Sequence, residues 1–122
     1  MTLQHVATDQ APKAIGPYSQ AIIANGFVFT AGQVAFIPET MELVKGDVQV
    51  QTKQALTNLK AVLAKAGTSF DHIDMNDFAK MNETYSEMMG AARPARSAVE
   101  VARLPRDALV EIECVALIPS KL

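Results

Sequence analysis

The sequence predicts an α+β protein in which two helices cover one face of a β-sheet. Apolar stretches that alternate with polar residues, bounded by turn signals, occupy both ends of the chain, and two stretches with the 3.6-residue apolar period lie between them. The expected order is therefore strand, strand, helix, helix, strand, strand. With 122 residues, 49% of them hydrophobic and 20% charged, the chain is expected to fold as a single domain over residues 1–122.

Two segments of the first half are expected to lie outside helices and long strands. Residues 1–17 predict an irregular arm, because Ala11-Pro12 and Gly16-Pro17 disfavour helix. Further on, Ile37-Pro38-Glu39-Thr40 predicts a turn, which a short extended piece from Glu42 to Lys45 follows.

A β-hairpin is predicted between these two segments. Tyr18 to Ala24 has the composition of a strand, Asn25-Gly26 is the strongest short hairpin signal, and Phe27 to Gln33 returns as the second strand. Gly32 lies inside that returning strand, where glycine indicates a bulge or a close approach of the backbone to something else.

Two helices are predicted in the middle of the chain. The first has Asp47 as its N-terminal cap and ends at Gly67, and the second runs from about Met75 to Met89 and ends at Gly90. Both have an apolar stripe that must face a sheet or another helix. The stripe of the second helix consists of Phe78, Met81, Tyr85, Met88 and Met89.

The stretch from Arg93 to Glu113 predicts two more strands. Ser97 to Val101 and Ala108 to Ile118 alternate, and Leu104-Pro105-Arg106-Asp107 supplies turn chemistry, so an antiparallel pair or a close relative of one is expected. Because strand side chains repeat every two residues, the second strand has two distinct faces. One face carries Val110, Ile112, Cys114 and Ala116, and the other carries Leu109, Glu111, Glu113, Val115 and Leu117.

Two glutamates on so apolar a strand are expected to have a functional role or polar partners, because a carboxylate loses hydration energy when it is buried. Arg96, just before the partner strand, is the candidate companion. We assign Glu111 to the site and Glu113 to a structural role, either paired with an arginine such as Arg103 or facing a subunit interface. Taken alone, Arg96 is better interpreted as a surface or structural ion-pair residue, and Tyr18 as a half-buried packing residue.

The bulk properties exclude several classes of function. No apolar run is long enough to span a bilayer, and the net charge of −2 gives no electrostatic footprint for nucleic acid. The first residues lack the features of secretory and mitochondrial presequences, so a cytoplasmic protein is expected. Cys114 is the one cysteine and is expected to be an inert buried thiol, and His5 and His72 have no second ligand at metal spacing.

Several short motifs occur together in collinear order, and as a set they are specific. They are Ala14-Ile15-Gly16-Pro17-Tyr18-Ser19-Gln20-Ala21, Ala31-Gly32-Gln33, Asp74-Met75-Asn76-Asp77-Phe78, Pro94-Ala95-Arg96-Ser97, and Val101-Ala102-Arg103-Leu104-Pro105 through Glu111-Ile112-Glu113. In these motifs the chain resembles the reactive intermediate deaminase A family, also called the RidA or YjgF-type family. The resemblance implies a chorismate-mutase-like α+β fold and a homotrimer with clefts between its subunits.

The resemblance also implies an activity and its residues. The family hydrolyses reactive enamine and imine acids (2-aminoacrylate with its tautomer 2-iminopropanoate, and 2-iminobutanoate) to 2-oxo acids and ammonia, without cofactor or metal. Arg96 would hold the substrate carboxylate, Glu111 would activate water, and Tyr18 would line the cleft. Gly32 would bring the backbone close to the ligand, and Asn82 would be a wall contact. An arginine fork and a glutamate base suit this chemistry.

The chain departs from the family pattern at two cleft positions. Many members carry serine before the Gly-Gln motif and cysteine or threonine two residues after the motif arginine, where this chain has Ala31 and Ala98. Since Arg96 and Glu111 remain, we expect a changed rate or substrate range more than a lost activity.

A larger departure lies between the helices, where the family usually has a full strand. Here Thr68 to Ile73 runs directly into the predicted second helix, so about five or six residues are missing. One hypothesis is that Thr68 to Asp74 is drawn out to replace that strand. The alternatives are a sheet short of one strand, with an exposed edge, or a sequence that lacks residues of the natural protein.

Two other functions compete with the deaminase interpretation. The chain could keep the trimer cleft and serve as a non-catalytic metabolite-binding or protein-protecting partner. RNA cleavage or translation inhibition, ascribed to some relatives, is supported by neither the charge nor a patch of basic and aromatic residues.

Overall fold

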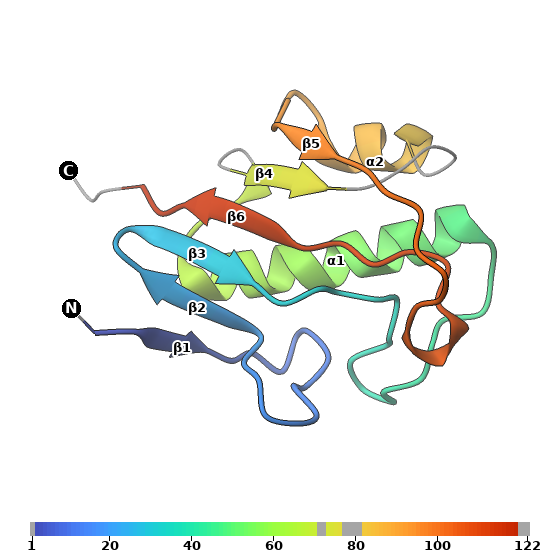
Figure 1. The fold of residues 1–122 in the computed structure, drawn as a ribbon, viewed down its shortest axis with the longest axis horizontal. Coiled ribbons are helices and arrows are strands. Elements are labelled where there is room, and N and C mark those ends of the chain that lie inside the picture. The colour runs from blue at the N-terminus through green and yellow to red at the C-terminus, as the bar shows by residue number, and fades with distance from the viewer. Residues whose placement is uncertain (1, 71–72, 77–81, 120–122) are drawn as a thin grey trace.

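The structure is a computed structural model that describes residues 2–70, 73–76 and 82–119. Within these residues one six-stranded sheet has the order β1-β2-β3-β6-β4-β5 (Figure 1). Neighbouring strands are antiparallel, except for the parallel pair of β4 and β5. The strands are β1 (Gln4–Val6), β2 (Ala21–Ala24), β3 (Phe27–Thr30), β4 (Ile73–Asn76), β5 (Arg96–Ser97) and β6 (Cys114–Leu117).

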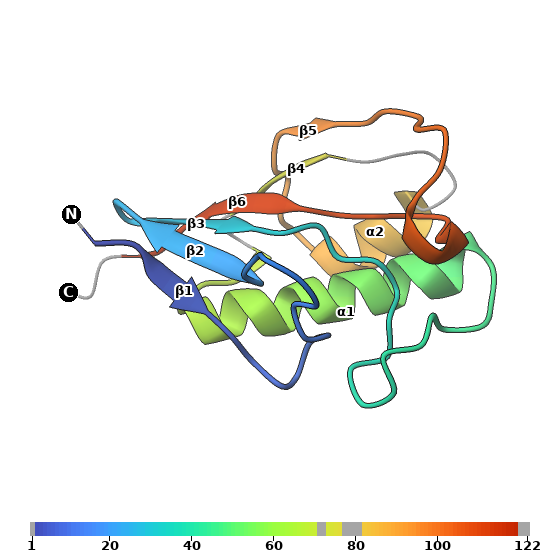
Figure 2. The same cartoon turned by 60° about the horizontal axis from the view of Figure 1, so that its bottom comes forward.

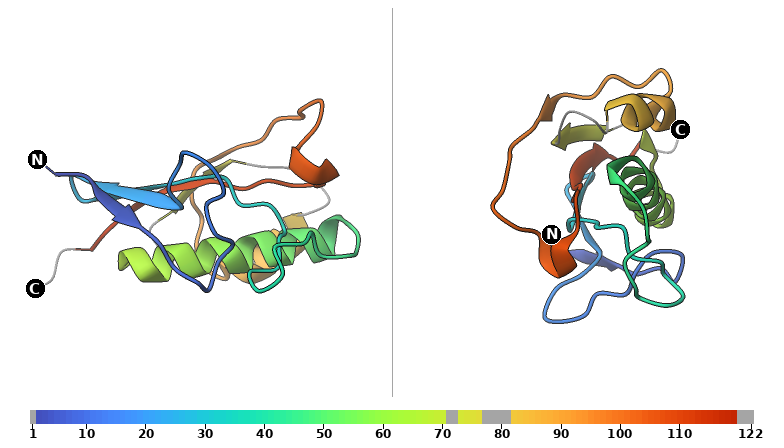
Figure 3. Two further views of the ribbon diagram at one scale, coloured as in Figure 1. Left: turned by 90° about the horizontal axis from the view of Figure 1, so that it is seen from below. Right: turned by 90° about the vertical axis from the view of Figure 1, so that its right-hand side faces the viewer.

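The helices α1 (Val48–Ala66) and α2 (Asn82–Met89) pack side by side on one face of the sheet, which confirms the predicted α+β class (Figures 2 and 3). The first helix begins and ends as predicted. The Asp47 carboxylate accepts hydrogen bonds of 3.0 Å from the N–H groups of Gln49 and Val50, and Gly67 ends the helix with a φ of 92°.

The core lies between α1 and the sheet. Buried side chains of β3 and β6 point toward the helix, and the buried stripe of α1 faces them. The hydrophobic effect favours this layer because it removes apolar surface from water on both elements. The largest fully buried apolar side chains are Val28, Leu56, Leu59, Val62, Leu63 and Ile112.

The predicted hairpin is confirmed, with shorter strands than expected. Asn25 and Gly26 have φ angles of 50° and 80°, as a two-residue turn with two positive φ angles requires. Regular pairing begins at Ala21 and ends at Thr30. Beyond it, Gln33 forms an isolated antiparallel bridge with Ile112.

The prediction of a wholly irregular arm over residues 1–17 is wrong. Gln4–Val6 pairs with β2, and Val6 is buried against the core. The prolines that argued against helix lie further along, at Pro12 and Pro17, and so do not interrupt this pairing. An edge strand of this length is specified by the neighbouring strand more than by its own composition.

The predicted start of the second helix is also wrong. Ile73–Asn76 forms β4, which lies between β6 and β5, and the helix is seen from Asn82 onward. A strand between the helices is therefore present, at residues 73–76 and not over the whole of 68–74. Tyr85 and Met89 are buried and Met88 partly buried, as the apolar stripe predicts. Phe78 and Met81 lie outside the described residues.

The two strands predicted after Arg93 do not pair with each other, because β4 lies between β5 and β6. The predicted turn is confirmed by the short 3-10 helix η3 (Pro105–Asp107). Residues 98–104 bow away from the sheet on the side opposite the helices (Figure 3, right). The predicted alternation is confirmed: Val110 and Ile112 are buried, whereas Leu109 is exposed.

Candidate active site

Glu111 lies in the extended segment that leads into β6, between buried Val110 and buried Ile112. Its own side chain points to the other side of the segment and is partly buried. It lines a cavity of about 850 Å³ between this segment and the bowed loop. The cavity walls are Val48, Ala98, Val99, Glu100, Val101, Ala102, Arg103, Leu104, Ala108, Leu109, Val110, Glu111 and Glu113.

Gly32 lies directly against the Glu111 side chain. A Cβ added to Gly32 would lie 2.8 Å from Cδ and 2.9 Å from Cγ of Glu111, and closer still to Oε1. The bridge next to Gly32 holds the two segments together, since Gln33 donates to the Ile112 carbonyl at 2.7 Å and Ile112 donates back at 3.0 Å. The close backbone approach predicted for Gly32 is confirmed, and its partner is Glu111.

The surroundings of Glu111 favour its protonated form. Burial is the larger cause and the charge of Glu113 the smaller, and together they raise the pKa of the Glu111 carboxyl above its ordinary value. Among the described residues, no hydrogen bond or ion pair engages this carboxylate. A carboxylate with a raised pKa and free oxygens beside a cavity is suited to accept a proton from a bound molecule.

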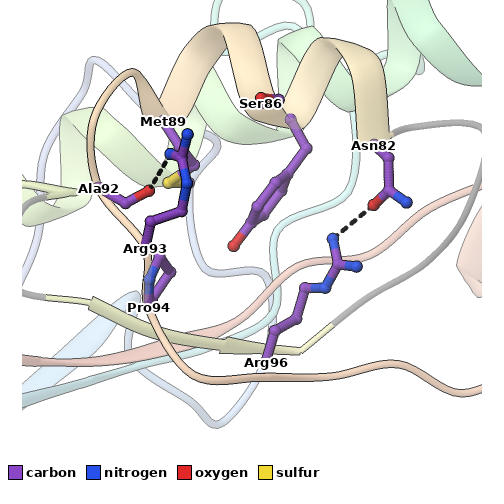
Figure 4. A pocket seen from close by; sticks show the side chains of 8 residues that line it. Asn82, Ser86, Met89, Ala92, Arg93, Pro94 and Arg96 are labelled. Atoms are coloured by element: carbon purple, nitrogen blue, oxygen red, sulfur yellow. Dashed lines mark hydrogen bonds between the residues drawn. The ribbon is translucent and has the colours of Figure 1, made fainter.

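Arg96 lines a second, smaller cavity of about 290 Å³ beside α2. Figure 4 shows its side chain turned toward Asn82 at the start of that helix. The guanidinium donates a 2.5 Å hydrogen bond to Asn82 Oδ1, and its Cζ lies 5.1 Å from the ring centre of Tyr85. The amide and the aromatic ring together fix the orientation of the guanidinium.

Arg96 and Glu111 therefore line different cavities of the single chain. Within one chain, the expected pairing of Arg96 with the glutamates is wrong, because Arg96 donates to Asn82 instead. The intervening β4 separates the two segments in the sheet. The suggested pairing of Glu113 with Arg103 is also wrong, since Arg103 forms a bidentate pair with Asp107 at 2.6 and 3.1 Å. Four residues of separation across the η3 turn bring that closer partner into reach.

The other predicted site residues fall in three places. Ala98 lines the large cavity with Glu111, and Ala31 precedes Gly32 and donates its N–H to the Gln20 carbonyl at 2.9 Å. Tyr18 is 53% exposed, and its hydroxyl oxygen accepts a hydrogen bond of 3.3 Å from the Ile15 N–H. Tyr18 is thus more exposed than the half-buried packing residue that its sequence alone suggests.

Tyr85 is buried as its place in the apolar stripe predicts, but its contact with Arg96 was not predicted. It follows Asn82 by three residues, so both lie on one face of α2 toward Arg96. That spacing of an amide and a tyrosine was the available signal.

The remaining groups in the described part of the chain do not suggest metal or thiol chemistry. Cys114 is buried as predicted; burial, partly offset by the Thr30 hydrogen bond, raises the pKa of its thiol to about 11. His5 bonds Ser19 through Nδ1 at 2.8 Å, and His72 lies outside the described residues. Residues 2–70, 73–76 and 82–119 contain no cluster of three potential metal ligands and no helix long and apolar enough to cross a membrane.

Comparison with known proteins identifies relatives over nearly the whole chain. Residues 8–118 match the family described as Endoribonuclease L-PSP. A RutC family protein of Synechocystis is 53% identical, with 98% of this chain and 100% of that protein covered. The 2-iminobutanoate/2-iminopropanoate deaminase of Mus musculus is 42% identical, with 92% and 89% covered. The crystal structure of E. coli TdcF with bound serine has a TM-score of 0.85 at 41% identity and covers 93% of this chain and 98% of its own.

The fold and the motifs thus define an α+β protein with the chorismate-mutase-like fold of RidA structures. The chain belongs to the RidA/YjgF family, which includes the RutC and L-PSP proteins. The alignment to the Synechocystis protein is 130 residues long and this chain has 122, so at least eight residues of that relative have no counterpart here.

Proposed function

We propose that this protein hydrolyses short imino acids, such as 2-iminopropanoate and 2-iminobutanoate, to 2-oxo acids and ammonia. The observation that carries this proposal is the Glu111 carboxylate, which is partly buried against Gly32 at the wall of the large cavity. The 42% identity to the mouse deaminase supports the reaction class, and the serine bound to TdcF supports a small amino-acid-like ligand.

Glu111 acts as the base in this scheme. Starting from the protonated imine, Glu111 takes a proton from water as the water oxygen bonds to the imine carbon, which gives a neutral tetrahedral carbinolamine. Glu111 then gives this proton to the nitrogen and takes the hydroxyl proton as the C–N bond breaks, so that the carbonyl forms and ammonia leaves. The proton then on Glu111 passes to ammonia, which is released as ammonium. One water is consumed for each 2-oxo acid and ammonia released. A general base of this kind contributes about 10²- to 10⁴-fold.

Arg96 binds the carboxylate of the imino acid through its guanidinium fork. In the free chain Asn82 and Tyr85 orient that fork, and one of its N–H donors is already engaged by Asn82. The exposed side chain leaves further donors for a ligand. Anchoring the carboxylate fixes which carbon of a small acid faces the base.

The protein acts as a homotrimer with the site completed between subunits, as the family resemblance implies. Two features support this: Arg96 and Glu111 line different cavities of one chain, and the sheet exposes an apolar face. This apolar sheet face consists of Phe27, Phe29, Val115 and Leu117, which are cross-strand neighbours on the side away from the helices. Contiguous apolar surface of this kind is typical of subunit interfaces.

The test measures turnover and ligand affinity on the same proteins. 2-Iminopropanoate is generated in place by an amino-acid oxidase, and release of ammonia is followed with wild type, Glu111→Gln and Arg96→Ala. Wild type is expected to accelerate hydrolysis, Glu111→Gln to lose at least about 100-fold, and Arg96→Ala to lose turnover together with affinity for 2-oxobutanoate. A folded wild type that binds 2-oxobutanoate without accelerating hydrolysis would favour the non-catalytic metabolite-binding alternative.

A further inference from the structure

Gln51 is a buried amide whose hydrogen bond leaves its own helix. It lies in the first turn of α1, is 4% exposed, and accepts a hydrogen bond of 2.9 Å at Oε1 from the backbone N–H of Leu109. Leu109 precedes Glu111 by two residues and is itself exposed. Since the buried Gln51 amide accepts from a backbone N–H of another segment, this hydrogen bond connects α1 to the segment of Glu111.

Few other hydrogen bonds hold that segment. Regular pairing of β6 begins at Cys114, and in the described part of the chain the bridge between Gln33 and Ile112 is the pairing that precedes it. On the other side of Leu109, the η3 turn contains two positive φ angles, at Arg106 and Asp107. Glu111 therefore lies between two hydrogen-bonded positions, Leu109 bound to Gln51 of α1 and Ile112 bound to Gln33. Figures 1 and 2 show this segment running over the amino-terminal half of α1, on the sheet side of the helix.

We propose that Gln51 is a positioning residue for Glu111. By accepting the hydrogen bond from the Leu109 N–H, Gln51 fixes the distance of residues 109–111 from α1. This position of the backbone keeps the Glu111 side chain in contact with Gly32. Gln51 does not line the cavity, so it acts through the main chain and not on the ligand. The inference rests on the proposed role of Glu111 as the base.

The variant Gln51→Met tests this role, because methionine has a similar length and lacks the acceptor oxygen. Turnover of 2-iminopropanoate is expected to fall about 10-fold, since displacement of a catalytic group by 1 Å can lower rates up to about 100-fold. KM is expected to change less than twofold. The acid limb of the pH profile is expected to move to lower pH, because Glu111 gains contact with water while Glu100, Glu113 and Arg103 around the cavity are unchanged.

Gln54→Met is the matched control. It removes an amide from the next turn of the same helix, where Gln54 donates to Asn58 Oδ1 at 2.9 Å and does not reach the segment of Glu111. Its kinetics and pH profile should match those of wild type. The variant Gln51→Glu restores an acceptor oxygen at nearly the same length and should recover most of the turnover. Equal losses in Gln51→Met and Gln54→Met, or in Gln51→Met and Gln51→Glu, would contradict the proposal.

Two further readouts do not depend on catalysis. Hydrogen exchange of the Leu109 amide should accelerate in Gln51→Met and not in Gln54→Met, and NMR titration of the Glu111 carboxyl should shift in the same variant alone. If the exchange of the Leu109 amide and the titration of Glu111 both change while wild type shows no turnover, the proposed function is wrong, but Gln51 still positions the segment of Glu111. If neither changes in a folded Gln51→Met, the positioning role is wrong whatever the activity.

Discussion

At the scale of single residues, the contact between Gly32 and Glu111 is the feature on which the site depends. The φ angle of Gly32 is not in the left-handed region, so its backbone tolerates other residues and the constraint is space alone. Gly32→Ala would place a methyl group where the Glu111 carboxylate now lies. Turnover is expected to fall about 10- to 100-fold, while urea denaturation should show a free energy of unfolding within about 1 kcal/mol of wild type.

A double-mutant cycle separates this contact from a general effect of the added methyl group. In a Glu111→Ala background the displaced atoms are absent, so Gly32→Ala should cost no further activity. Independent, additive losses from the two substitutions would show that Gly32 does not act through Glu111.

The pH dependence of turnover also belongs to this scale. Because burial and Glu113 raise the pKa of Glu111, the base is protonated and turnover is lost as the pH falls through that raised value. Glu113→Gln removes the negative charge of Glu113 near Glu111 and thereby lowers the pKa of Glu111. The acid limb of the kcat/KM profile should therefore move to lower pH.

Glu100→Gln is the matched control for this shift. Glu100 lines the same cavity but does not contribute to the raised pKa of Glu111, so the profile should stay where it is in wild type. A limb that moves equally in both variants, or in neither, contradicts the assignment of the limb to Glu111.

At the scale of elements, the sequence predicts those parts whose determinants are local. The first helix is predicted correctly at both ends, because Asp47 and Gly67 each act on the residues next to them and the apolar period repeats along the helix between them. Asn25-Gly26 fixes the hairpin in the same way. By contrast, the sequence wrongly predicts helix for Met75 and Asn76 of β4, because the place of that strand between β6 and β5 comes from pairing with strands far away in the sequence.

The same distinction explains which parts of the site could be predicted. The alternation along the last strand correctly placed Glu111 opposite the buried face, and a glycine within a strand correctly indicated a close approach. The partners of Arg96 and Arg103 could not be predicted, since they depend on the path of β4 and on the η3 turn. Gln51 gave no periodic or motif signal, because its partner is a backbone N–H far along the chain.

At the scale of the whole molecule, the proposed trimer depends on the apolar sheet face. Phe29 is 47% exposed there, its ring centre lies 6.4 Å from that of Phe27, and Val115 is its cross-strand partner. Phe29→Asp places a charge in this face, which a subunit interface would have to desolvate. Light scattering coupled to size-exclusion chromatography should show a trimer for wild type and a monomer for the variant, with at least about 10-fold lower turnover.

Val50→Asp is the control, because Val50 is also an exposed apolar residue but lies on α1, on the other face of the sheet. It should leave the trimer and the turnover unchanged. A Phe29→Asp variant that remains a trimer would place the interface elsewhere, and a wild-type monomer with full turnover would show that the site needs no second subunit.

The measurement that tests the account most directly is the rate of ammonia release from 2-iminopropanoate with wild type and Glu111→Gln at equal concentration. Glutamine keeps the shape of the side chain beside Gly32 and removes its basicity. If Glu111 is the base, wild type accelerates the release and the rate with Glu111→Gln is close to that of buffer. Equal acceleration by both folded proteins would contradict the role of Glu111 as the base.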